Sequence, residues 1–320
     1  MTDRATAMDT AMAALRVSGQ VLLVDAYAPP WGIAIPAGVD LGPLLDAPRH
    51  TRVVPFHIVR RGAFELKPDG LEPQVVRAGE AVICVGGQSH DMVEGASTEC
   101  VPFGALLGGA ASLSTSAPGA TELVCGVFLL RSLTRNPLID ALPPVLHVDV
   151  SGRTGGSTLS LLTALLTGEL EQSRAGKRYM ASRFVELFCA EAIRQYVDSA
   201  AHETPGWLRA VRDPKIGEAL NAVHASPGAP HSVASLAAGV NMSPSRFAAR
   251  FREVMGSPAM GYVNGRRMDL ACEQLATTDE AVERVAHAVG YDSVAAFSRA
   301  FSRECGISPS AYRRRFRDAA

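Results

Sequence analysis

The chain has 320 residues, of which 47% are hydrophobic and 20% charged, so it can fill large cores and its length favours two domains. It contains no run of about 18 uninterrupted apolar residues, and its first residues lack the pattern of a signal peptide. We therefore expect a cytoplasmic protein with no membrane partner. The six cysteines form no C-x-x-C pair, which argues against a disulfide framework or a zinc ribbon.

The first 150 residues contain short apolar runs separated by proline, glycine and aspartate, a texture typical of β-strands. The runs are VLLVDAY, WGIAI, RVVPFHIVRRGAFEL, EAVICV and TELVCGVFLL. Residues 104–121 are rich in small residues without periodicity and are predicted to form a loop. A small β-barrel is the economical assembly of these strands.

The segment G-E-A-V-I-C-V-G-G-Q-S-H, from Gly79 to His90, resembles the second cupin motif. The N-terminal part as a whole resembles the cupin sensor domains that are fused to AraC-type DNA-binding domains. This resemblance implies a cupin-like ligand-sensing domain over residues 1–200 and a small-molecule effector. Two positions depart from the pattern: Val85 replaces the motif's proline, and the first motif's H-x-H is absent, since only His57 with Glu65 downstream can be placed.

Cupin enzymes hold iron, manganese or zinc with several histidines and a carboxylate, and that cluster is incomplete here. His57, His90 and Cys125 lie on successive predicted strands and are candidate ligands for zinc or another divalent metal. The alternative is that they line a pocket or are hydrogen-bonded without a metal. Trp31, in the A-P-P-W-G turn, is a further candidate for ligand contact, although a lone tryptophan is more often a core residue.

Leucines and aromatic residues recur at helical spacing over residues 157–200, which predicts two amphipathic helices. These helices either close the barrel of one subunit or pair with the same helices of a second subunit in a homodimer, and the sequence does not separate the two arrangements. Residues 201–213, which include Pro205, are predicted to link the N-terminal domain to a C-terminal domain at 214–320.

The formal net charge of -1 conceals an uneven distribution of charge. Residues 212–320 carry 14 basic and 11 acidic side chains, whereas residues 1–211 carry 17 basic and 21 acidic ones. A basic C-terminal part indicates a polyanionic partner for that part, although so small an excess is weak evidence by itself.

Two stretches of the C-terminal part repeat one another. VASLAAGVNMSPSRFAARFREVMGSPAMGY at 233–262 aligns with VERVAHAVGYDSVAAFSRAFSRECGISPSAY at 282–312. Each copy predicts a short helix, a tight turn and a second helix that begins at Ser-Pro or Asp-Ser and ends at Gly256 or Gly306. This order is that of a helix-turn-helix motif. The residues between the copies predict one helix that spaces the two motifs by about one DNA turn, ~34 Å.

The second helix of each copy has two opposite faces. Phe247, Phe251 and Val254 share one face in the first copy, and phenylalanines recur at the equivalent positions of the second, which predicts burial. Short side chains and arginines occupy the other face, and an arginine in the major groove can bind guanine O6 and N7 together. The predicted DNA contacts are Ser245, Arg246, Ala249, Arg252, Ala295, Arg299, Ser302 and Arg303. The alternative is that these arginines only solvate an exposed face.

Residues 214–317 resemble the DNA-binding domain of the AraC/XylS family of bacterial transcription regulators. The motifs A-x-x-V-G-Y, F-S-R-A-F, G-x-S-P and Y-R-R occur in order in the second copy, whereas the first copy has its proline one place earlier, in G-S-P-A-M-G-Y. The resemblance implies an α+β multidomain protein: a cupin-like β-barrel with helices at about 157–200, then an all-α domain of two helix-turn-helix motifs. It also implies double-stranded DNA and RNA polymerase as partners.

These patterns favour a transcription regulator controlled by a small molecule, and not an enzyme. The alternative is a cupin metalloenzyme with a nucleic-acid-binding tail, which needs the complete metal cluster that this sequence lacks. No nucleophile triad, P-loop or dinucleotide motif supports the enzyme. A constitutive architectural DNA-binding protein is a third class, and it would not need the large N-terminal domain.

Overall fold

The structure is a computed structural model that describes residues 6–48, 51–96, 99–131, 136–152, 157–199 and 205–317. Contacts divide the chain into two compact units. The sheet unit comprises Arg16–Arg131 and Leu142–Ala200. The helical unit comprises Met1–Leu15, Ser132–Ala141 and Ala201–Ala320. Among the helices of the described segments, none is long and apolar enough to cross a bilayer.

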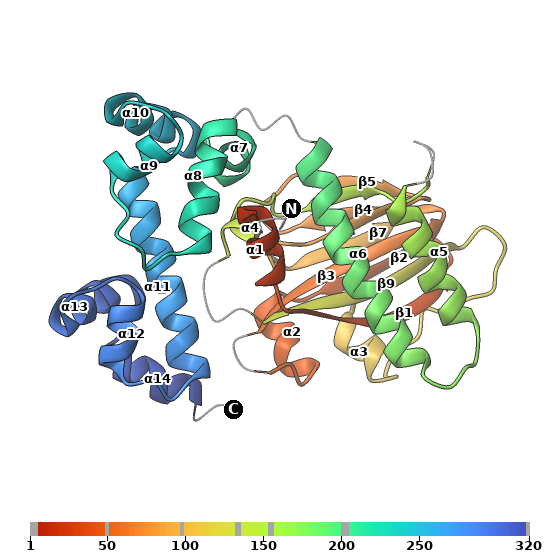
Figure 1. Cartoon of the computed structure of the whole chain (residues 1–320). Helices are drawn as coiled ribbons and strands as arrows, with labels where there is room; N and C mark the ends of the chain where they lie inside the picture. Colours follow the sequence, from red (N-terminus) through yellow and green to blue (C-terminus); the bar gives the residue numbers. More distant parts are fainter. Residues whose placement is uncertain are drawn as a thin grey trace. The chain divides into compact units, whose positions relative to one another are not determined.

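The sheet unit is built from two five-stranded sheets (Figure 1). The first has, in order, β1 (Val17–Tyr27), β9 (Thr121–Arg131), β3 (Thr51–Arg61), β6 (Glu80–Ile83) and β10 (Leu146–Asp149). The second has β5 (Gln74–Arg77), β4 (Ala63–Pro68), β7 (His90–Glu94), β2 (Trp31–Ile35) and β8 (Val101–Pro102). Neighbouring strands are antiparallel except β2 and β8, which are parallel.

The main core of the sheet unit lies between the two sheets. Buried side chains of both sheets form one apolar cluster, with Val59 and Cys125 from the first sheet and Ile33 and Phe64 from the second. The central strands β3 and β9 are buried almost throughout because alternate side chains of each strand enter this core while the others face a helix on the outer side. This explains why both strands read as continuous apolar runs in the sequence.

Two helices, α5 (Thr158–Glu171) and α6 (Lys177–Ser199), follow the last strand, as predicted. Helix α6 lies across the outer face of the first sheet (Figure 1). Its Phe188 ring packs 6.0 Å from Phe56 and 6.4 Å from Phe128, measured between ring centroids. A Cβ atom on Gly19 of β1 would lie 2.1 Å from Cγ1 of Val185, so this glycine allows the close approach of the helix. The buried face of α6 therefore closes the sheet of its own subunit.

Two short helices complete the sheet unit, α2 (Gly38–Leu44) and α3 (Phe103–Leu107). The prediction of a loop over 104–121 was wrong at its start, because α3 covers residues 104–107. The buried side chain of Phe103 anchors this helix to the core between the sheets.

The helical unit consists of short helices grouped around one long helix. Their bounds are α1 (Ala7–Ala13), α4 (Pro137–Asp140), α7 (Trp207–Arg212), α8 (Pro214–Ala225), α9 (Val233–Gly239), α10 (Pro244–Met255), α11 (Ala259–Thr277), α12 (Val282–Ala288), α13 (Val294–Cys305) and α14 (Pro309–Arg317). The pairs α9–α10 and α12–α13 lie toward opposite ends of α11 (Figure 1).

Helix α7 occupies most of the described part of the segment predicted as a linker. It forms because Trp207 and Leu208 are buried, and the Trp207 Nε1–H donates to the Tyr262 hydroxyl oxygen at 2.9 Å. Asp213 then caps α8 by accepting from the backbone N–H groups of Lys215 and Ile216. The chain between the units thus contains a helix that packs within the helical unit.

Candidate functional site

The second helix-turn-helix consists of α12 and α13. The Ser293 side chain caps α13 by accepting from the Ala296 backbone N–H, and Gly306 ends the helix in the left-handed region at φ 75°. Phe297 and Phe301 are fully buried, and their ring centroids lie 5.5 Å apart. The prediction that this face of α13 forms the core is confirmed.

The opposite face of α13 points away from this core. Ala295, Arg299 and Arg303 are exposed and Ser302 is half-buried. Among the ion pairs that the described residues form, none includes Arg299 or Arg303. Both guanidinium groups therefore present their donors to solvent, as a contact to a phosphate or a base edge requires.

The first helix-turn-helix, α9 and α10, repeats this construction. Ser243 caps α10, Pro244 is its first residue, and Gly256 ends it at φ 80°. The side chains of Phe247, Phe251 and Val254 are buried. The four predicted DNA contacts of this helix are all exposed: Ser245, Arg246, Ala249 and Arg252.

A different arginine of α10 has a structural role. Arg250 donates from Nε and one terminal nitrogen to the Asp213 carboxylate at 2.9 and 2.7 Å, and it also pairs with Glu253. The pKa of Asp213 lies below its ordinary value because the hydrogen bonds to Ile216 and Arg250 outweigh the opposing effect of burial. Arg250 thus joins α10 to the start of α8, and it is not among the predicted DNA contacts.

Helix α11 connects the two motifs. Its buried residues include Met268, Ala271, Cys272 and Leu275, which pack with Phe297 and Phe301 in one apolar cluster. The 19 residues of α11 correspond to a helix about 28 Å long. One rigid helix therefore sets the distance between α10 and α13.

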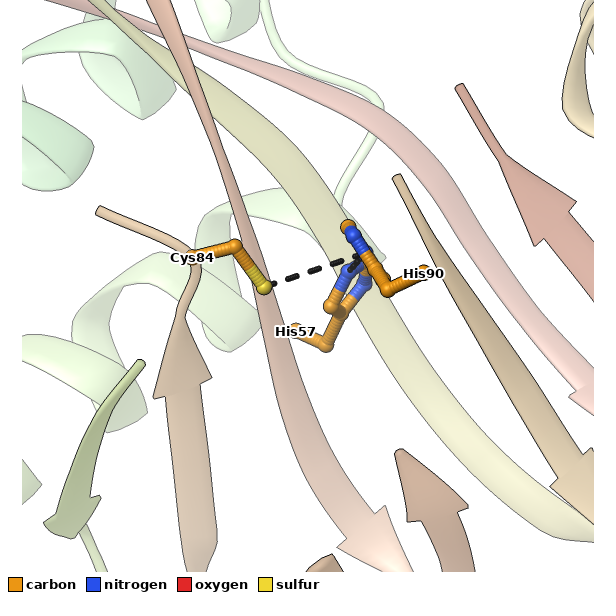
Figure 2. A group of neighbouring side chains, drawn as sticks. All are labelled: His57, Cys84 and His90. Atoms are coloured by element: carbon orange, nitrogen blue, oxygen red, sulfur yellow. Dashed lines mark hydrogen bonds between the residues drawn. The ribbon is translucent and has the colours of Figure 1, made fainter. Parts of the chain in front are cut away.

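The sheet unit contains a buried cluster of histidines and cysteines. His57 on β3 faces Cys125 on β9, because the two residues are paired in the register of these strands. The Nδ1 atom of His57 lies 3.1 Å from Cys125 Sγ, and its Nε2 atom lies 2.9 Å from Nε2 of His90. Figure 2 shows the third neighbour, Cys84, whose Sγ lies 3.8 Å from His90 Nε2. The structure thus brings the three predicted metal candidates together and adds Cys84 to them.

The hydrogen bonds of this cluster form a directional chain. His90 Nδ1 lies 3.2 Å from the Gln88 carbonyl oxygen, which can only accept, so Nδ1 carries the proton and Nε2 is a bare acceptor. His57 then donates from Nε2 to His90, and Cys125 donates its thiol proton to His57 Nδ1. In this arrangement every ring nitrogen of His57 and His90 has a hydrogen-bond partner, and all of these side chains are neutral.

Burial keeps the cluster uncharged. It lowers the pKa of His57 well below the ordinary histidine value, with a further contribution from His90, and it lowers the pKa of His90 as well. Burial also raises the pKa of Cys84 to about 12 and raises that of Cys125. Neutral imidazoles are good metal ligands, whereas these thiols would have to lose a proton to bind a metal.

One set of three donors in this cluster has the spacing of a metal site. His57, Cys84 and His90 each offer one donor atom, and the three donor atoms lie within 4.8 Å of one another. Two imidazole nitrogens and one sulfur form a donor set that suits zinc, whose bonds to such donors are about 2.0 to 2.3 Å long. Cys125 lies on the opposite side of the His57 ring, at Nδ1, so it supports His57 from behind.

Trp31 lies in the same core as the cluster. Its side chain is buried, and its Nε1–H donates to Glu94 Oε2 at 2.7 Å. Its ring centroid lies 6.2 Å from that of Phe64, which in turn lies 6.3 Å from that of His57. Trp31 is therefore a neighbour of the cluster through one aromatic ring.

Sequence reasoning missed Cys84 because its metal candidates were chosen from residues at successive strand positions. Cys84 directly follows β6, and only Gln88 and Ser89 among polar side chains separate it from His90. Its place inside the segment that resembles the second cupin motif was the available signal.

A helical unit with two such motifs and a sheet unit with a buried histidine–cysteine cluster define a helix-turn-helix protein with a second domain. The model of the family described as Cupin matches residues 7–198, and the model described as Helix-turn-helix domain matches residues 236–315. These matches confirm the predicted order of a cupin-like domain followed by a helix-turn-helix domain. The strands of the described residues form two five-stranded sheets, and a closed barrel is not among them.

Two relatives that cover most of the chain support the same assignment. An AraC-like transcription regulator of Streptomyces lividans is 30% identical over 272 residues, which are 84% of this chain and 88% of that protein. The HTH-type transcriptional regulator AlkR of Acinetobacter baylyi is 27% identical and covers 80% of this chain and 86% of its own. The DNA-binding domain of AdpA, solved in complex with a target DNA, is 33% identical over 33% of this chain and 95% of that one, with a TM-score of 0.31. The chain belongs to the AraC-like transcription regulators with an N-terminal cupin domain.

Proposed function

We propose that this regulator reads its DNA site with α10 and α13 together. The observation that supports this most strongly is the repeated geometry. In both helices phenylalanines are buried on one face, while exposed arginines that form no ion pair among the described residues lie on the other. The contacts proposed are Ser245, Arg246, Ala249, Arg252, Ala295, Arg299, Ser302 and Arg303. Two reading helices on one chain fit two successive major grooves.

Sequencing of the genomic DNA fragments that the purified full-length protein retains tests this proposal. We expect enrichment of a bipartite site whose halves lie about one helical turn apart. A motif with a single half, or retention without any shared sequence, would contradict two reading helices. Repeating the selection with a cell extract tests whether a small molecule changes the sites that are bound.

We propose further that the cupin domain senses the effector at the core that holds the histidine–cysteine cluster and Trp31. Buried histidines are uncommon in a sheet core, and this cluster lies among aromatic side chains with which an organic ligand or a metal can interact. We assign zinc or another divalent metal to His57 Nε2, His90 Nε2 and Cys84 Sγ. Cys125 takes the supporting position behind His57.

Elemental analysis of protein purified without chelators tests the metal assignment. We expect about one equivalent of metal in the wild type, loss of metal in Cys84→Ala, and retention of metal in the matched variant Cys125→Ala at reduced affinity. Metal in Cys84→Ala but not in Cys125→Ala would favour the trio of His57, His90 and Cys125. Absence of metal from the wild type removes the metal assignment and leaves an organic effector.

The proposed partners are a second copy of the chain and RNA polymerase, in the cytoplasm. The pair α5 and α6 exposes large apolar side chains although α6 already covers the sheet, with Leu161 61%, Leu165 53% and Leu187 55% exposed. We expect the double variant Leu161→Ser and Leu165→Ser to shift the mass measured by light scattering from dimer to monomer. The control is Val39→Ser, which removes an apolar side chain that is 82% exposed elsewhere in the sheet unit.

The histidine–cysteine cluster favours a regulator over a metalloenzyme with a DNA-binding tail. The relatives described above are named as transcription regulators. The cluster is deeply buried, with His57 and His90 only 2% and 3% exposed, so a reacting substrate would have to open the core to reach it. A DNA-binding affinity that changes with the effector, without turnover of that effector, is the result we expect.

A further inference from the structure

Two cysteines of the second helix-turn-helix lie against each other. Cys272 is buried on α11, and Cys305 is the half-buried last residue of α13. Their Sγ atoms are 3.5 Å apart. The remaining cysteines are at positions 84, 100, 125 and 189, which all belong to the sheet unit, so this pair is separate from the histidine cluster.

The surroundings of the pair favour reaction at Cys305 first. The hydrogen bond from Cys272 lowers the pKa of Cys305, against the opposing effects of burial and of Glu304 and Asp269. The same hydrogen bond and burial raise the pKa of Cys272. The thiolate is the nucleophilic form, and Cys305 is also the more exposed of the two, so a dissolved oxidant meets Cys305 before Cys272.

We propose that Cys272 and Cys305 form a reversible disulfide when the protein meets a peroxide, and that this bond lowers the affinity of the second helix-turn-helix for DNA. The effect on DNA binding rests on the proposed role of α13, whereas the formation of the disulfide does not.

The chemistry needs one molecule of hydrogen peroxide and two thiols. The Cys305 thiolate attacks one peroxide oxygen, the O–O bond breaks, and a sulfenic acid forms at Cys305 while hydroxide leaves. Hydroxide takes the Cys272 thiol proton, and the Cys272 sulfur then attacks the Cys305 sulfur and expels a second hydroxide, which takes up the proton that Cys305 lost on ionisation. Both sulfurs are oxidised, both peroxide oxygens are reduced, and the products are one disulfide and two water molecules. A thiol such as dithiothreitol reverses the reaction by exchange.

The bond would alter the position of the proposed reading helix. A disulfide requires an S–S distance of about 2.05 Å, so the two sulfurs must approach by roughly 1.5 Å from their present contact. Cys305 lies at the end of α13, two residues after Arg303, so movement of that end displaces the arginine face. Contacts to bases depend on positions held within about 0.5 Å. The disulfide therefore draws α13 toward α11 and away from the geometry that reads DNA.

The test uses the full-length protein and a DNA site taken from the selection experiment. Protein reduced and then treated with hydrogen peroxide is alkylated and digested, and the peptides are examined by mass spectrometry for the Cys272–Cys305 link. The Kd for DNA is measured by fluorescence anisotropy before oxidation, after oxidation and after dithiothreitol. We expect the linked peptide, a Kd raised about tenfold, and recovery on reduction.

Variants separate the pair from other oxidation events. Cys305→Ala and Cys272→Ala should bind DNA when reduced and show no change on peroxide treatment, whereas Cys100→Ser, at a half-buried cysteine of the sheet unit, should respond like the wild type. Absence of the linked peptide, or its formation with an unchanged Kd, would overturn the inference. If the selection with the reduced wild type yields no shared site, the proposed function fails while the linked peptide can still be sought, so the two failures are distinguishable.

Discussion

The substitution Phe301→Ala tests whether the aromatic face of α13 holds the second helix-turn-helix together. The Phe301 side chain is fully buried, and its ring centroid lies 5.5 Å from Phe297 and 5.4 Å from Tyr312. Truncation removes these contacts and leaves a cavity between α11, α13 and α14. Buried phenylalanine-to-alanine changes cost about 3 to 5 kcal/mol, which is a large share of the stability of a domain.

Hydrogen exchange followed by mass spectrometry measures this loss where it occurs, because the exchange of the α11–α14 peptides is read separately from that of the sheet unit. We expect faster exchange in those peptides for Phe301→Ala and a loss of DNA binding. The control Arg299→Ala lies two residues earlier on the exposed face and should leave exchange at the wild-type rate. Wild-type exchange in Phe301→Ala would refute the assignment of this face to the core.

Three further predictions concern other parts of the chain. Burial, and then the charge of Arg266, lower the pKa of His224 to about 3. As the pH falls below 6.5, His224 is therefore protonated in the unfolded chain but remains neutral in the folded chain. The free energy of unfolding of the helical unit should therefore fall by about 2 kcal/mol between pH 7 and 5, and urea titrations of His224→Gln should lack this pH dependence. Gly19→Val should destabilise the sheet unit by about 1 to 3 kcal/mol, seen in its melting temperature, because the added side chain meets Val185. DNA affinity should fall steeply as the salt concentration rises, and a salt-independent Kd would exclude phosphate contacts by the arginine faces.

The helix-turn-helix motifs were predictable in detail because their signals are local. Serine caps, the glycines 256 and 306, and phenylalanines four residues apart specify each helix within a dozen residues. The structure places these residues as the sequence predicts. Which arginine contacts a base is a property of the complex with DNA, so those assignments stay predictions.

The geometry of the histidine–cysteine cluster depends on pairings that the sequence does not encode locally. His57 and Cys125 meet because β3 and β9 pair in one register across 68 positions of sequence. His90 arrives from the other sheet, and Cys84 from the turn after β6. The predicted strand positions identified three of these residues, whereas only the fold shows on which side of the His57 ring each partner lies.

Helix α7 forms where the local sequence predicts a linker. The sequence between Pro205 and Pro214 is too short for a periodic pattern, and its flanking prolines favour a linker. The helix forms because Trp207 is buried and donates a hydrogen bond to the Tyr262 hydroxyl on α11, which is 55 positions away in the sequence. Tertiary packing therefore decides this segment.

Selection of binding sites from random DNA by the wild type and by Arg299→Ala tests the central claim most directly, namely that the exposed face of α13 reads base sequence. We predict that Arg299→Ala loses about 1 to 3 kcal/mol at the preferred site and accepts other bases at one or two positions, with the remaining positions unchanged. If the variant binds every sequence more weakly by the same factor and selects the wild-type site, Arg299 contacts phosphate and the proposed orientation of α13 in the groove is wrong.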